Sequence, residues 1–397
     1  MTPTVPRVDD AERRRRLGRR HHLAAQARAA DMGSAAHNLV ALHSTDPASV
    51  YLSAWARVDG ITHADIDQAL YDGRTVVKHM AMRRTVWAVA TDLLPVVQAA
   101  ASDDVATAQR RSLAREIVRA GVSQDGARWV ADAEAATVEV LVTTGPVSGR
   151  DLSRRVPALQ ARLTYGSGDK TQSVGVITRI MTILSASGQV TRARPGGAWN
   201  DRQPRWVLMG DWCPAAATEP APDAAAARST LARHWLHAFG PATFDDLKWW
   251  TGWTVARTKS ALRDADAVEV GLADDRQGFL LPDDLEPTEP VAPWVALLPA
   301  LDPTTMGWAQ RDWYLGPHRE LLFDSYGNAG PTVWSDGRVI GGWAQRPDAQ
   351  VVVQVLEDVG SGVREGIDAE ASRLTQWLAG VRVLPSFSTP LQRDLAG

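Results

Sequence analysis

Three segments of the chain share one order of polar and apolar positions. Each contains a Ser or Thr, an acidic residue three positions later, and an Ile or Leu directly after the acid. Such a hydroxyl accepts a hydrogen bond from a backbone N–H that has no partner within the helix. The acid at the third helical position accepts one in return from the backbone N–H of the capping residue. The segments therefore predict helices that begin after Thr62, Ser148 and Thr243. Their wide spacing suits three copies of a small domain rather than a solenoid.

The residues around the second copy follow the order helix, turn, helix and hairpin. We expect a short helix at 151–156, a longer amphipathic helix at 173–185, and alternating strands at 189–193 and 206–208. This order is typical of a winged helix.

The third copy has the same order in shorter form. A helix begins at Thr243, Gly252 ends it, a second helix covers 254–263, and strands are expected at 267–272 and 279–281. In the first copy the pattern predicts helices at 62–73 and 75–82 and a strand at 85–90.

The last quarter of the chain differs in kind. Short strands separated by Gly, Pro and Asp turns are predicted at 295–298, 321–323, 332–334, 339–343 and 351–356, and a helix at 370–378. We interpret this part as a small β-barrel-like domain that holds Trp308 to Trp313 on an exposed loop.

The overall prediction is an α+β fold of three tandem winged helices followed by a C-terminal β-barrel-like domain. Connectors rich in Pro, Ala and acidic residues separate the third copy from its neighbours. The predicted domains are 1–125 (N-terminal helices and first winged helix), 126–213 (second), 225–285 (third) and 294–397 (C-terminal domain).

Composition limits the function classes. No apolar run reaches the length of a membrane span, and no secretory signal is present, so we expect no membrane association and a cytoplasmic location. The single cysteine, Cys213, excludes an internal disulfide and a cysteine-based zinc site. His234 and His237 share a helix face without a third ligand nearby, so we expect no metal and no cofactor. Motifs for nucleotide enzymes and serine hydrolases are absent.

The charge distribution bears on nucleic-acid binding. The net charge of −3 argues weakly against it, because phosphate neutralisation supplies much of the affinity of DNA-binding proteins. Arginine clusters nevertheless gather in the first half of the chain, from the 13–20 run onward. We expect Arg83, Arg84, Arg192 and Arg194 to contact phosphates.

Several segments resemble a known family. Leu42–Pro47, Tyr51–Arg57 and Met82–Thr85 are similar to the opening of the winged-helix family that includes the AlkZ and YcaQ DNA glycosylases. Leu297–Pro303 and Asp336–Gly341 are similar to its C-terminal domain. The resemblance spans roughly 13–380. It implies three winged helices that form a concave channel for double-stranded DNA, and excision of alkylated purines by a monomer.

The chain departs from this family at one important point. Characterised members carry Gln-x-Gln or Gln-x-Asp where this chain has His43-Ser44-Thr45. An N-alkylated purine is already an activated leaving group, so the site must stabilise the sugar cation and position a water. We expect His43 to act as general base, Thr45 to orient the water, and Asp46 to polarise His43.

Other interpretations remain open at this stage. His43 is also compatible with capping the end of a helix at 38–43, followed by a turn before Pro47. The chain is then a non-catalytic winged-helix DNA-binding protein, such as a regulator or a damage sensor. A scaffold without any DNA role is a third hypothesis. In the glycosylase hypothesis, Arg311 and Trp313 probe a DNA groove.

Overall fold

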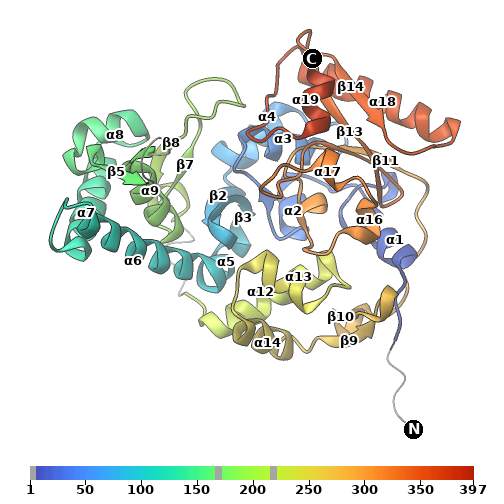
Figure 1. Ribbon diagram of the computed structural model, residues 1–397, viewed down its shortest axis with the longest axis horizontal. Helices are drawn as coiled ribbons and strands as arrows, with labels where there is room; N and C mark the ends of the chain where they lie inside the picture. The colour runs from blue at the N-terminus through green and yellow to red at the C-terminus, as the bar shows by residue number, and fades with distance from the viewer. Residues whose placement is uncertain (1–5, 166–171, 215–220) are drawn as a thin grey trace.

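The computed structural model describes residues 6–165, 172–214 and 221–397 (Figure 1). Its mixture of helices and antiparallel sheets confirms the predicted α+β class. The three repeated segments all begin helices, because each hydroxyl accepts a hydrogen bond from the N–H of the acid three positions later. The helices are α4 (His63–Asp67), α8 (Gly149–Arg155) and α13 (Phe244–Thr251), capped by Thr62, Ser148 and Thr243.

The first copy contains a hairpin where a second helix was expected. Val76–Ala81 form strand β2, which pairs antiparallel with β3 (Thr85–Ala90), and β1 (Leu42–His43) joins the other edge of β3. The helix predicted at 75–82 is therefore wrong. All six residues of β2 are buried, and β-branched residues such as Val76 favour the extended backbone.

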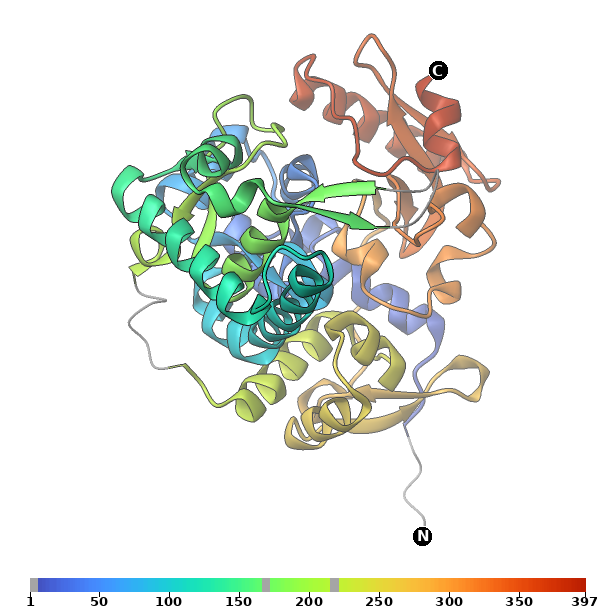
Figure 2. The ribbon, with the colours of Figure 1, turned by 60° about the vertical axis from the view of Figure 1, so that its left-hand side comes forward.

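The second copy has the predicted hairpin, made of β7 (Val190–Ala193) and β8 (Arg205–Leu208). Its helix α9 (Val176–Ala186) begins later than expected, because the residues before it form a hairpin of β5 (Arg162–Tyr165) and β6 (Gln172–Gly175) that projects from this module (Figure 2). Two helices precede the copy and β4 pairs with β8; these elements are α6 (Asp103–Arg119), α7 (Gly126–Thr144) and β4 (Val147–Ser148).

The third copy follows the prediction closely. Gly252 ends α13 in the left-handed conformation (φ 77°), which only glycine adopts without strain. The other elements are α12 (Ala224–Phe239), α14 (Val255–Asp264), β9 (Val268–Gly271) and β10 (Gln277–Leu280). Residues 215–220, in the expected connector before it, lie outside the described residues.

The C-terminal part is an open sheet and not a barrel. Its strands pair in chain order, and the sheet does not close on itself among the described residues. The strands are β11 (Val295–Leu298), β12 (Thr332–Ser335), β13 (Arg338–Gln345) and β14 (Val351–Val355). The strand predicted at 321–323 is wrong, because Arg319–Leu322 form helix α17.

The remaining α-helices lie outside the elements described so far, and the last two pack against the C-terminal sheet. They are α1 (Asp10–Arg20), α2 (Met32–Asn38), α3 (Pro47–Trp55), α5 (Leu94–Val97), α10 (Met209–Trp212), α15 (Pro303–Met306), α16 (Asp312–Leu315), α18 (Ser361–Leu378) and α19 (Pro390–Ala396).

Helix α1 shows that the N-terminal arginine run is structural. Arg16 is buried and pairs with Glu12 (2.8 Å) and Asp284 (3.1 Å), and Arg13 lies buried over the ring of Trp313 (3.9 Å). These guanidinium groups join α1 to the third copy and the C-terminal part, and they are therefore not a free basic surface.

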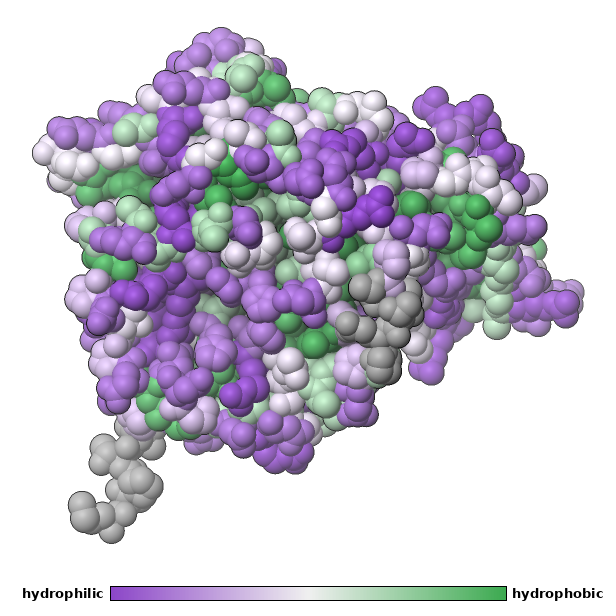
Figure 3. All heavy atoms as spheres, turned by 180° about the vertical axis from the view of Figure 1, so that it is seen from behind, coloured by the Kyte–Doolittle hydropathy of each residue, from purple (hydrophilic) through white to green (hydrophobic). Residues whose placement is uncertain are grey.

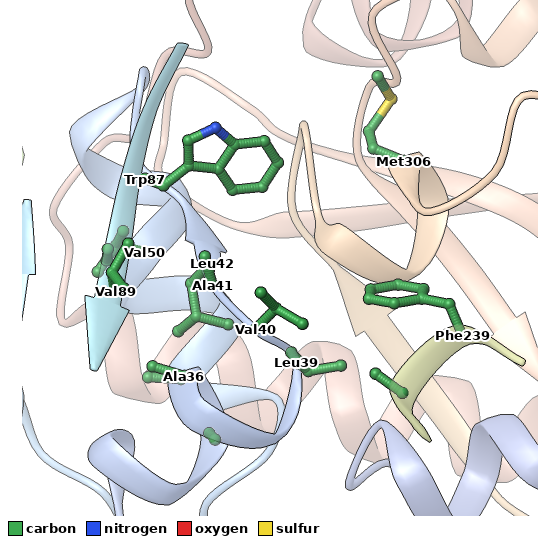
Figure 4. Packing of buried hydrophobic residues seen from close by; sticks show 14 of the residues in the cluster. Ala36, Leu39, Val40, Ala41, Leu42, Val50, Trp87, Val89, Phe239 and Met306 are labelled. Atoms are coloured by element: carbon green, nitrogen blue, oxygen red, sulfur yellow. The ribbon is translucent and has the colours of Figure 1, made fainter. Parts of the chain in front are cut away.

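One hydrophobic core joins the first copy, the third copy and the C-terminal sheet. Figure 4 shows Leu39 and Val40 between Trp87 on one side and Phe239 and Met306 on the other. The second copy has a separate core around α6, α7 and α9. On the face in Figure 3, hydrophilic residues predominate, with hydrophobic residues in small groups between them.

Candidate active site

The His43 segment forms a turn between a strand and a helix. His43 pairs with Trp87 across β1 and β3, and the Ser44 N–H donates to Val86 O (2.8 Å). Asp46 then caps α3, with Pro47 in its first turn. The expected turn before Pro47 is confirmed, whereas helix capping by His43 is wrong, because α2 ends at Asn38.

His43 is held in an apolar setting. Its side chain is 4% exposed, and its ring centroid lies 4.9 Å from that of Trp87. Burial lowers the pKa of His43 to about 3, and the nearby Arg83 charge acts in the same direction. The imidazole therefore stays neutral at physiological pH and has little affinity for a proton, which disfavours the expected role of general base.

The neighbouring polar groups determine what His43 offers. Nδ1 accepts a long hydrogen bond from the Thr45 N–H (3.4 Å), which favours the tautomer with a proton on Nε2. The Thr45 side chain is half-buried, and its Oγ1 accepts a long hydrogen bond from the Val86 N–H (3.4 Å). The segment thus supplies a ring N–H donor on His43 and a hydroxyl on Thr45, two residues later, and each group is able to hold a water.

Asp46 does not hydrogen-bond to His43 as expected; its carboxylate is engaged elsewhere. Its carboxylate is buried and accepts hydrogen bonds from the N–H groups of Ala48 (3.2 Å) and Ser386 (2.8 Å). The side chain thus caps α3 and fixes the C-terminal segment, and no hydrogen bond joins it to His43. The expectation that Asp46 polarises His43 is wrong. The carboxylate that acts electrostatically on His43 is Asp302, which raises its pKa slightly against the larger effect of burial.

The β2–β3 turn places cations beside this site. Arg83 and Arg84 both have positive φ (55° and 61°) in the three-residue turn Met82–Arg84. The Arg83 guanidinium lies over the Trp249 ring at 4.0 Å, and burial with the charge of Arg311 lowers its pKa to about 10. Arg84 is exposed and donates to Gln109 on α6 (3.4 Å).

Arg311 and Trp313 are buried, so the exposed loop expected at Trp308 to Trp313 is wrong. Arg311 is 4% exposed and donates to Trp308 O (2.9 Å), and Trp313 is 4% exposed. The loop is held by Asp246, whose Oδ1 accepts the N–H groups of Ala309 and Gln310, each at 2.9 Å. Neither side chain is free to enter a DNA groove.

The two arginines expected on the second hairpin have different surroundings. Arg194 is exposed but pairs with Asp67 and with Asp72 (2.9 Å), so its charge is compensated within the chain. Arg192 is half-buried beside the ring of Trp206 (5.5 Å). The prediction of a phosphate-gripping pair on this wing is not supported by these positions.

A cleft of about 380 Å³ extends from the β2–β3 turn along α6 and α14. Arg257 is paired with Asp104 there (2.6 Å). In the described parts of the chain, Arg83, Arg84 and Arg111 form no ion pair, although all three line this cleft. Arg111 also lines a groove of about 630 Å³ between α6 and α7, where Arg115 is exposed.

The α6 arginines are functional candidates that the sequence analysis missed. Their signal was the spacing of four between Arg111 and Arg115, which places both on one face of a helix. Trp87 and Trp249 were also missed as parts of the site, because a tryptophan in an apolar run predicts core packing as well as a site wall.

The described residues contain no group of three His, Cys, Asp or Glu side chains arranged to hold a metal ion. None of their helices is both long enough and apolar enough to cross a bilayer.

Comparisons with known proteins support one family. A family model described as DNA glycosylase AlkZ-like matches residues 36–377, which include His43, the β2–β3 turn and α6. Among solved structures, the Streptomyces sahachiroi DNA glycosylase AlkZ superposes with a TM-score of 0.72 and 18% sequence identity, over 94% of this chain and 97% of that chain. No curated protein sequence matches at a significant level.

Proposed function

This chain belongs to the AlkZ-like DNA glycosylase family, and we propose that it releases N-alkylated purines from double-stranded DNA by water attack at the anomeric carbon. The observation that carries this proposal is the neutral, buried His43 at a strand-to-helix turn, beside Thr45 and next to uncompensated arginines. His43 stands where the family resemblance expects a glutamine.

The chemistry demands little acid–base assistance. When the N-glycosidic bond breaks, its electron pair neutralises the cationic purine and leaves an oxocarbenium-like sugar. The oxygen of one water bonds to C1′ and its extra proton passes to solvent. The side chains need only hold that water and avoid repelling the sugar cation. A neutral imidazole and a hydroxyl meet both needs, whereas an imidazolium at the same place raises the barrier.

In this proposal the DNA-binding surface extends from the β2–β3 turn along α6. Arg83, Arg84 and Arg111 line one cleft, Arg111 and Arg115 line the neighbouring groove, and the charge of Arg83 acts on His43. These four cations suit a phosphate backbone, which is recognised chiefly by Arg and Lys. In this proposal the three capped modules are tandem winged helices, and the protein acts as a monomer. A regulator with one winged helix usually dimerises to obtain a DNA-binding surface of comparable size, and three modules in one chain make that unnecessary.

A second candidate function is a non-catalytic DNA-binding protein. The absence of both family glutamines at 43 and 45 favours this alternative. Salt-sensitive DNA binding is expected of both candidates, so only base release separates them.

The test is base release from a duplex methylated at purine N7 and N3. Wild type, His43→Ala, His43→Gln and the exposed control His237→Ala are compared, with duplex affinity measured for each. We expect release by the wild type and the control, a loss of at least about 100-fold in His43→Ala, and partial activity in His43→Gln, at unchanged affinity. Duplex binding without release by the wild type favours the non-catalytic function. Equal release by wild type and His43→Ala removes His43 from the mechanism.

A further inference from the structure

A further cavity lies across the β1–β3–β2 sheet from the candidate active site. His43, Trp87 and His79 are opposite one another in the strand register, so their side chains share one face. Met80 follows His79 and therefore faces the other side, where it lines a cavity of about 450 Å³. The cavity thus lies between the first and second modules and is separate from the His43 site.

The cavity is lined mainly by apolar and hydroxyl-bearing residues, together with two arginines. Residues of α8, α9 and the β7–β8 hairpin supply most of this lining. They include the apolar Met181 and Trp206 and the cations Arg150 and Arg192. No lining residue is acidic, so the positive charge has no counterpart within the cavity.

Arg192 is the partly buried cation of this lining, whereas Arg150 is exposed. It forms no hydrogen bond or ion pair with any described residue, whereas Arg194, two positions later, pairs with two carboxylates. Burial lowers the pKa of Arg192 to about 10. Partly buried cations are normally paired, because desolvation without a partner is costly.

Lys78 adds to the positive potential on this side of the sheet. Its buried Nζ donates to Tyr71 Oη (2.7 Å) and has no carboxylate partner among the described residues. Burial, with the charge of Arg192, lowers the pKa of Lys78 to about 7. An anion beside Arg192 therefore offsets charge that the chain itself leaves uncompensated.

We propose that this cavity binds a small aromatic anion, with the ring between Met80, Met181 and Trp206 and the anionic group on Arg192. Its volume lies within the range of about 300–1,000 Å³ that is typical of small-molecule sites, which often lie between domains. Apolar and thioether side chains favour a flat ring, and a guanidinium binds a carboxylate or phosphate in a bidentate manner. The proposal is independent of the glycosylase function.

Isothermal titration calorimetry of the full chain tests it with 2-naphthoate and its neutral analogue 2-naphthamide. We expect saturable 1:1 binding of the carboxylate and at least tenfold weaker binding of the amide. Arg192→Met should weaken naphthoate binding at least tenfold and remove the preference for charge, while Arg194→Met stays within twofold of wild type. If Arg192→Met does not fold, Arg150→Met replaces it, because Arg150 lies on the exposed surface of α8. This variant should also weaken naphthoate binding. Equal affinity for both probes, unchanged binding by Arg192→Met or Arg150→Met, or no saturation at millimolar naphthoate overturns the proposal.

Discussion

Arg57 and Asp302 form a bidentate ion pair, with N–O distances of 2.8 and 2.7 Å and both side chains fully buried. Asp302 also accepts the Ser53 hydroxyl (2.8 Å) and caps α15. The pair joins α3, which directly follows the His43 turn, to the C-terminal part. It therefore fixes the site against a segment that is distant in sequence.

Asp302→Asn should destabilise the fold by about 3–5 kcal/mol, because it leaves the Arg57 guanidinium buried without its counter-charge. Urea unfolding measures this. Glu370→Gln is the matched control, since it breaks the partly exposed pair with Arg373 (2.8 Å) and should cost less than about 1 kcal/mol. Equal costs for the two variants would contradict the importance assigned to Arg57 and Asp302.

The capping acids of the first and third copies should differ in their effects. Asp65 and Asp246 both complete a capping box, but only Asp246 also holds the amides of Ala309 and Gln310. Asp246→Ala should cost at least about 1–3 kcal/mol more than Asp65→Ala, because two further donors lose their acceptor. Faster hydrogen exchange at Gln310 should accompany Asp246→Ala alone. Unaltered exchange there argues against the anchoring role.

Base release should show no inflection near pH 6.5. The neutral form of His43 is the working form, and burial lowers its pKa to about 3, so protonation does not remove it above about pH 4. The measurement is the single-turnover rate from pH 5 to 8, corrected for spontaneous release in the absence of protein. A tenfold fall per pH unit below 6.5 points instead to an exposed imidazole acting as base.

The same burial makes His43 a source of acid sensitivity. The unfolded chain binds a proton on this side chain near pH 6.5, whereas the native chain does so only near pH 3. Unfolding therefore takes up a proton between these values, and the free energy of unfolding falls as the pH falls, by up to about 1.4 kcal/mol per unit. Urea titrations of wild type and His43→Gln at pH 4.5 and 7 measure this, and the variant should lose less stability on acidification. Parallel losses count against a buried neutral imidazole.

Arg111→Ala combined with Arg115→Ala should weaken duplex binding for all sequences. Each lost phosphate contact reduces the slope of log affinity against log salt by about 0.9, so the pair should flatten it by about two units. Fluorescence anisotropy over a salt series gives the slope. Arg364→Ala on the exposed side of α18 is the control and should leave it unchanged. An unchanged slope in the double variant excludes α6 from the interface.

Local sequence patterns predicted much of the secondary structure. The three capped helices depend on a hydroxyl and an acid three positions apart, and Gly252 and the turn at Asp336 and Gly337 depend on positive φ. These interactions lie within a few residues of one another. The segment 75–82 was misassigned because a short apolar run has no periodicity that separates a buried strand from a helix.

The sequence by itself determined where the three capped helices begin, the turn at His43-Ser44-Thr45 and the family to which it points, because these depend on neighbouring residues and recurring motifs. Only the tertiary structure decided which arginines are free. Arg16 and Arg194 pair with carboxylates and Arg311 is buried in the core, whereas Arg111 has no carboxylate partner among the described residues. It also decided that His43 is neutral and that the Asp46 carboxylate accepts from Ala48 and Ser386. Charge compensation and desolvation depend on residues that are far apart in the sequence, and no local pattern records their proximity.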